Sequence, residues 1–109
     1  MLPSKDRLRF REVEEVFKKG QRKATPFFSA TFLSGADRTA FGVSVSKKVM
    51  KNASDRNKIR RRIYSVLSKF KKYKSNTHVV FTPKKDVLGM PFETLKKEIE
   101  DFLARAKIL

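Results

Sequence analysis

The stretch SDRNKIRRRIYSVLSKFKKY, from Ser54 to Tyr73, predicts the element around which the fold is organised. Its apolar residues recur at the spacing of one helix face. They are Ile59, Ile63, Val66, Leu67 and Phe70. This stripe predicts an amphipathic helix that buries one face in a core, with Asn52 or Ser54 as its N-cap.

The other faces of this helix are basic. Between Lys47 and Lys74 the sequence holds twelve Lys or Arg residues and a single acid, Asp55. Solvated helix surfaces ordinarily mix charges of both signs, so this concentration indicates a binding surface for a polyanion. The string RNKIRR, residues 56–61, combines guanidinium groups that suit phosphates with an amide that both donates and accepts hydrogen bonds. We therefore expect folded RNA to bind here.

Runs of β-forming residues on both sides of the helix predict a small sheet. Phe27–Ser34 and Thr39–Ser46 are separated by a short turn that contains Gly35, so we predict that they pair as a hairpin. His78–Thr82 (HVVFT) is predicted as a third strand.

The strand predicted at residues 39–46 has one apolar face and one face of small side chains. Its apolar residues are Phe41, Val43 and Val45, and they alternate with Gly42, Ser44 and Ser46. Alternate residues of a strand point to opposite faces of the sheet. The small face is either a plain exposed face or room for an extended ligand that lies flat on the sheet.

Two further helices are predicted near the ends of the chain. The first runs from about Arg9 to Lys19 and stops at Gly20. The last opens at Pro91, and its apolar residues are Phe92, Leu95, Ile99, Phe102 and Leu103. The order helix, strand, strand, helix, strand, helix predicts an α+β fold, a single-domain α-β sandwich that spans residues 1–109.

Composition points to a polyanionic partner and excludes several kinds of site. The 109 residues include 27 Lys or Arg and 11 Asp or Glu, for a net charge of +16. A chain with this charge repels itself, and nucleic acid is the partner that best neutralises it. There is no Cys, which excludes disulfides, thiol nucleophiles and zinc sites built from Cys. No apolar stretch approaches the roughly 18 residues of a spanning helix, so we expect a cytoplasmic protein without a membrane partner.

The sequence offers no evident catalytic group. His78 is the only His, and its place in an apolar strand favours a structural role. Asp55 suits a helix N-terminus better than a magnesium site. We therefore expect no catalytic residue, no metal site and no small-molecule substrate on this chain.

A segment that overlaps the basic helix resembles a known family. SKKVMKNASDRNKIRRRI, Ser46–Ile63, is similar to the signature of the bacterial ribonuclease P protein family, in which a strand ending in Ser-Lys-Lys leads into an Arg-Asn-x-x-Lys/Arg-Arg helix. The opening MLPSKDRL and a first helix that ends in FKKG, Phe17–Gly20, also resemble the family. The resemblance covers nearly the whole chain.

This resemblance implies an RNA-binding protein subunit that assists a catalytic RNA in removing the 5′ leader from precursor tRNA. The implied partners are the catalytic RNA subunit and precursor tRNA. The implied cofactor is Mg²⁺, bound mainly by the RNA subunit and the substrate. The family also has a left-handed βαβ crossover, here Thr39–Thr82, against the general right-handed preference.

The resemblance also implies two sets of site residues. The RNA-binding set is Lys47, Lys48, Lys51, Arg56, Asn57, Lys58, Arg60, Arg61 and Arg62. The leader-cleft set is Phe17, Thr31, Ser44, Ser46 and Tyr64. The chain has Val13, Thr31 and Tyr64 where the family commonly has two aromatics and an Arg, so the leader preference is expected to differ.

Two other readings share the basic charge. A ribosomal or RNA-chaperone protein would not need the Arg-Asn signature followed by a buried stripe, and a basic DNA-binding domain would show a recognition-helix pair or zinc spacing. The RNA that copurifies with the protein distinguishes these readings.

Overall fold

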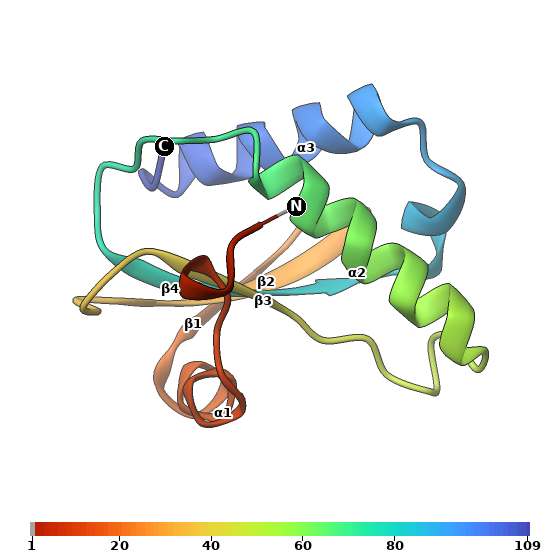
Figure 1. The fold of residues 1–109 in the computed structure, drawn as a ribbon, viewed down its shortest axis with the longest axis horizontal. Helices are drawn as coiled ribbons and strands as arrows, with labels where there is room; N and C mark the ends of the chain where they lie inside the picture. Colours follow the sequence, from red (N-terminus) through yellow and green to blue (C-terminus); the bar gives the residue numbers. More distant parts are fainter. Residues whose placement is uncertain (1) are drawn as a thin grey trace.

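The computed structural model describes residues 2–109, and it contains one four-stranded sheet with helices on both faces (Figure 1). The long helices α2 (Ala53–Leu67) and α3 (Phe92–Arg105) cover one face, and α1 (Phe10–Lys19) lies against the other. The elements are η1 (Ser4–Asp6), α1 (Phe10–Lys19), β1 (Gln21–Ala24), β2 (Phe28–Ser34), β3 (Ala40–Val43), α2 (Ala53–Leu67), β4 (Thr77–Pro83), η2 (Lys85–Gly89) and α3 (Phe92–Arg105). Among the described residues, no helix could cross a membrane.

The strands lie in the order β1-β2-β4-β3, which corrects the predicted hairpin. β2 and β3 do not pair with each other, because β4 lies between them, antiparallel to β2 and parallel to β3. The apolar run of β4 is buried on both faces, and such strands belong in the middle of a sheet. The hairpin partner of β2 is β1, whose sequence QRKA is exposed throughout and was not predicted as a strand.

The main core lies between the sheet and the two helices α2 and α3. The apolar stripe predicted for α2 is confirmed, since Ile59, Ile63, Val66 and Leu67 are buried. The stripe of α3 is confirmed likewise. Aromatic rings from the sheet complete the core, and the rings of Phe28 and Phe81 meet edge to face at 5.4 Å between centroids.

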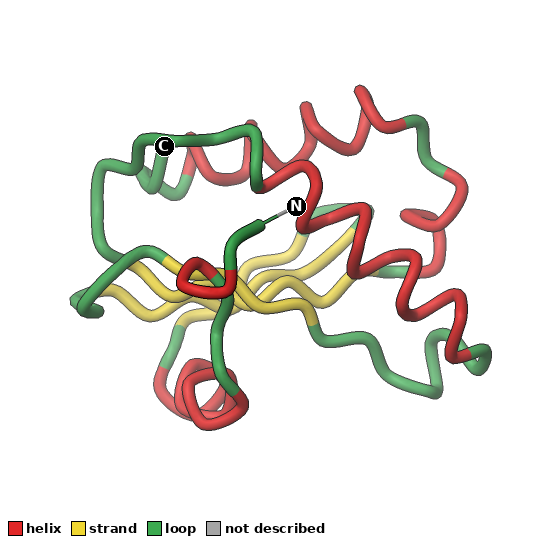
Figure 2. The backbone as a smooth tube through the Cα atoms, in the orientation of Figure 1, coloured by secondary structure: helices red, strands yellow, loops and turns green. Residues whose placement is uncertain are grey.

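Several predicted boundaries move by a few residues. Asn52 is the N-cap of α2, and its Oδ1 accepts a hydrogen bond from the Ser54 backbone N–H at 2.9 Å. The helix ends at Leu67 rather than near Tyr73, although Phe70 still packs against the core. β3 ends at Val43 rather than at Ser46, and a long loop leads from it to α2 (Figure 2).

A second, smaller apolar contact holds α1 to the opposite face of the sheet. Val16 of α1 is fully buried there, as is Val80 of β4. Gly42 of β3 permits the close approach, because a Cβ at this position would lie 3.2 Å from a methyl group of Val13. The small residue at position 42 is thus explained by helix packing rather than by a ligand.

Candidate nucleic-acid interface

The basic segment between Lys47 and Lys74 is not neutralised by acidic side chains of the described chain. None of its twelve cations forms an ion pair with any residue between 2 and 109. The predicted RNA-binding residues that are exposed are Lys47, Lys48, Lys51, Asn57, Lys58 and Arg61. Those that are half-buried are Arg56, Arg60 and Arg62.

The arginines of α2 differ in whether their guanidinium groups already form hydrogen bonds within the protein. The guanidinium of Arg56 donates to the carbonyls of Met50 and Lys51, both at 2.9 Å, and so holds the loop before the helix. That of Arg60 donates to Asn57 Oδ1 at 2.8 Å, one turn away. Arg61 is exposed and makes no side-chain hydrogen bond to the rest of the described chain. Its fork of donors is free to bind phosphate.

Arg62 points to another side of α2. Its guanidinium donates to the backbone carbonyl of Met90, which precedes α3, and its buried Nε finds no partner among residues 2–109. The predicted RNA-binding arginines therefore do not share one surface. Arg62 ties α2 to the segment before α3, while Arg61 faces outward.

A cleft opens between α1 and the sheet, and it brings together three of the five predicted leader-cleft residues. The cavity of about 320 Å³ is lined by Phe17, Gly20, Arg22, Thr31, Ser44 and Thr82. Phe17 is 47% exposed. Arg22 and Thr31 are paired across β1 and β2, which places a guanidinium beside the hydroxyl-lined floor. One aromatic ring, one cation and several hydroxyls suit a short single strand of nucleic acid.

Ser46 and Tyr64, the other two predicted cleft residues, do not line this cavity. The Ser46 hydroxyl accepts a hydrogen bond from the Val49 N–H at 3.2 Å and so stabilises the turn that follows β3. The ring of Tyr64 lies under Arg7, whose guanidinium carbon is 5.0 Å from the ring centroid. Tyr64 is partly buried against the core, and this burial raises the pKa of its hydroxyl.

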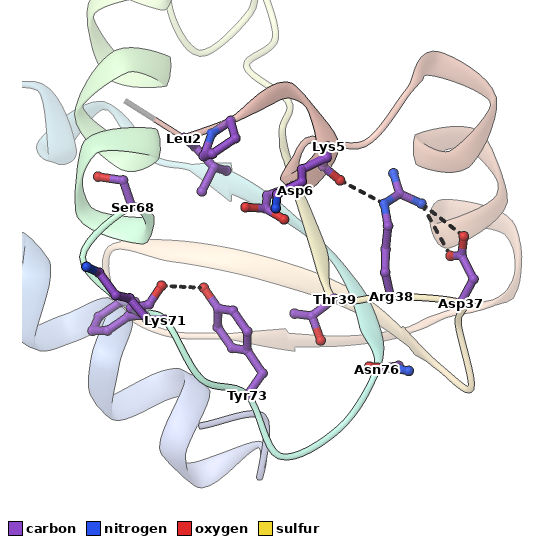
Figure 3. A pocket seen from close by; sticks show the side chains of 12 residues that line it. Leu2, Lys5, Asp6, Asp37, Arg38, Thr39, Ser68, Lys71, Tyr73 and Asn76 are labelled. Carbon is purple, nitrogen blue, oxygen red and sulfur yellow. Dashed lines mark hydrogen bonds and ion pairs between the residues drawn. The ribbon is translucent and has the colours of Figure 1, made fainter.

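An ion-pair network that the sequence did not reveal lies at the other end of α1. Arg38 donates to Glu12 at 2.9 Å. It also donates to Asp37 at 3.3 Å, and its Nε donates to the Lys5 carbonyl at 2.8 Å (Figure 3). The hydrogen bond from Arg38 is the main reason that the pKa of Glu12 falls to about 2. His78 Nε2 lies 3.3 Å from the same Asp37 carboxylate. Glu12, Arg38 and His78 are far apart in the chain, so no local pattern could have indicated the network.

The network does not fit a magnesium ion. Glu12, Asp37 and His78 place one ligand atom each within 4.8 Å of one another, as a metal site requires. The guanidinium of Arg38 already binds both carboxylates, however, and a divalent cation would have to displace it. Magnesium also prefers an all-oxygen shell, which His78 would interrupt.

Comparison with known proteins identifies the family. The family model described as Ribonuclease P matches residues 2–107. The chain belongs to the ribonuclease P protein family. The ribonuclease P protein component of a Pseudanabaena species is 32% identical over 113 residues, which cover 100% of this chain and 97% of that relative. That of Helicobacter acinonychis is 32% identical and covers 88% of this chain and 74% of the relative.

Solved structures of ribonuclease P proteins share the fold. A mutant of the Staphylococcus aureus protein matches with a TM-score of 0.82 at 25% identity, over 96% of this chain and 91% of that one. The Thermotoga maritima ribonuclease P protein matches with a TM-score of 0.78 at 25% identity, over 91% of this chain and 96% of that one. Family membership gives the chain the role of a protein component of ribonuclease P, an endoribonuclease of tRNA processing.

Proposed function

We propose that this ribonuclease P protein binds two different RNAs with two different surfaces. The basic, outward side of α2 and the loop before it bind the catalytic RNA subunit. The cleft between α1 and the sheet binds the single-stranded 5′ leader of precursor tRNA. The observation that carries this proposal is the separation of a segment of unpaired cations from a hydroxyl-lined cleft with one exposed aromatic ring.

The chemistry of the cleft suits a single strand rather than a duplex. Phe17 offers a face on which a base can stack, and Arg22 offers a charge for a phosphate. The hydroxyls of Thr31, Ser44 and Thr82 can each donate and accept, so they can meet base edges or riboses without demanding one sequence.

The two surfaces are joined by the chain itself. Ser44 lines the cleft, and the loop that continues from it carries Lys47 and Lys48 on the way to α2. Three residues of extended chain span about 10 Å. A leader that lies in the cleft would thus approach the same end of the molecule to which the catalytic RNA binds.

Hydrolysis is assigned to the RNA in this proposal. The acidic network of α1 is neutralised by Arg38, and Asp55 stands alone in the first turn of α2. We place the Mg²⁺ ions on the phosphates of the catalytic RNA and the substrate, and the chain's cations reduce the repulsion between these RNAs. The protein without the RNA subunit is expected to leave precursor tRNA intact in the presence of Mg²⁺.

The substitution Ser44→Glu tests the cleft. It places a carboxylate where a leader phosphate would pass, and we expect the holoenzyme to bind precursor tRNA roughly 5- to 20-fold more weakly. Affinity for mature tRNA, which has no leader, should stay within twofold. Ser34→Glu is the matched control, because it adds the same charge at the exposed end of β2, away from the cavity. An equal loss for both tRNAs would show that the cleft is not the leader site.

A further inference from the structure

Phe10 is the most exposed large apolar side chain of the described chain. Phe10 begins α1 and is 77% exposed. Burying an exposed phenyl ring is favourable, so a ring left in water beside a binding surface is a candidate contact for a partner.

Phe10 and Phe17 lie on the same side of α1. They are seven residues apart, which is two turns of helix, so their directions differ by only about 20° and their positions by about 10 Å. Phe17 lines the cleft. Phe10 therefore places a second aromatic ring on the side of α1 that borders the cleft, two turns before Phe17.

The direction of this continuation follows from how α1 lies along β3. Phe17 shares the cleft with Ser44, and Val13 approaches Gly42. The Leu8 N–H, just before the helix, donates to the Phe41 carbonyl at 2.8 Å. α1 and β3 thus run in the same direction. Phe10 lies away from the end of β3 that leads into the basic loop and α2.

We propose that the single-stranded RNA in the cleft continues along α1 and stacks a second, more distant base on Phe10. This inference rests on the proposed leader site and deepens it. The occupant is a polynucleotide because the contact is continuous with the cleft and because the chain carries a net charge of +16. Successive stacked nucleotides are about 3.4 Å apart, so the two rings are separated by at most about three nucleotides.

The experiment measures binding of precursor tRNAs with leaders of about 2, 4, 6, 8 and 10 nucleotides. This series includes leaders that are shorter and leaders that are longer than the roughly three-nucleotide distance between the two rings. Holoenzymes are assembled with Phe10→Ala, Phe10→Leu, Phe10→Tyr or Phe17→Ala. Phe10→Ala should weaken binding for long leaders only, by roughly 5- to 30-fold, which corresponds to about 1–2 kcal/mol for the loss of one stacked base. The loss with Phe17→Ala should begin at a leader shorter by two or three nucleotides.

The conservative variants identify the kind of contact. Phe10→Tyr keeps an aromatic face and should keep the affinity, whereas Phe10→Leu keeps an apolar side chain without that face and should behave like Phe10→Ala. A 2-aminopurine placed at the affected leader position should lose fluorescence on binding to the unaltered holoenzyme and recover it with Phe10→Ala.

The outcomes separate this inference from the leader site itself. If Phe17→Ala weakens binding of leader-bearing tRNA while Phe10→Ala does not, the extension along α1 is wrong and the cleft assignment stands. If Phe10→Ala weakens all leader lengths equally, Phe10 contacts another RNA or supports the fold, and the inference also fails. If neither variant depends on leader length, the leader site as a whole is wrong.

Discussion

At the scale of single residues, Arg38 does the most to join distant parts of the chain. It binds Glu12 of α1, Asp37 of its own loop and the carbonyls of Lys5 and Arg7. Because the pKa of Glu12 is about 2 in the folded protein and ordinarily 4.5, this carboxylate stabilises the fold above about pH 4.5. The stabilisation is lost as the pH falls through about 2.

Glu12→Gln tests this contribution. The amide oxygen can still accept the hydrogen bond from the Arg9 N–H, so the substitution removes mainly the charge. We expect the free energy of unfolding at pH 7 to fall by about 1–2 kcal/mol, and the difference from the unaltered protein to shrink toward zero near pH 2. Urea titrations across this pH range measure this difference in the free energy of unfolding. Glu14→Gln is the control, because Glu14 is exposed. A difference independent of pH would contradict the ion-pair account.

At the level of residues, the position on an element decides which of the predicted site residues lie together and which face outward. Phe17, Thr31 and Ser44 meet in one cleft, and Arg61 faces outward as its helical position indicates. The position on an element could not give the neighbours supplied by other elements. Arg62 meets a carbonyl that precedes α3 and Tyr64 meets Arg7, and neither partner is near in sequence.

At the scale of elements, the junction between α1 and the sheet depends on Gly20. A Cβ at this position would lie 2.6 Å from the Val16 carbonyl oxygen and 2.7 Å from that of Phe32, both backbone atoms that cannot turn away. The helix end and β2 can approach this closely only with glycine between them. The width of the cleft therefore depends on this residue.

Gly20→Ala should move α1 away from the sheet. We expect a loss of about 2 kcal/mol or more in the free energy of unfolding, together with weaker discrimination between precursor and mature tRNA. Gly89→Ala is the matched control, since a Cβ there would meet nothing within 4 Å. Thermal unfolding and tRNA binding measure the two effects. If Gly20→Ala and Gly89→Ala have the same stability and the same tRNA discrimination, the close contact at Gly20 does not determine the position of α1.

The positions of the helices along the chain were more predictable than the pairing of the strands in the sheet. Periodicity located α1, α2 and α3. α2 and α3 each bury an apolar stripe, whereas α1 buries only Val16 and leaves Phe10 and Phe17 exposed. Alternation in a strand indicates which face is buried but not which strand lies alongside. The sequence of β1 has no apolar alternation at all, so only its pairing with β2 defines it as a strand.

At the scale of the whole molecule, the dominant property is an uncompensated charge of +16. Binding to the catalytic RNA should weaken steeply with salt, with the logarithm of the binding constant falling by several units per tenfold increase in salt concentration. Arg61→Ala should reduce this slope by about one and leave thermal stability nearly unchanged, because Arg61 makes no bond within the described chain. Filter binding over a salt series measures the slope. A flat dependence would exclude phosphate contacts as the main source of affinity.

The position of β4 has a consequence for how the protein is made. β4 is the last strand in the chain, yet it lies between β2 and β3. Until residues 77–83 leave the ribosome, the long edge of β2 is open and β3 has no strand to pair with. An open edge invites pairing with another unfinished chain. The dense positive charge of α2 is synthesised before β4, and mutual repulsion then keeps nascent copies apart while the centre of the sheet is still missing.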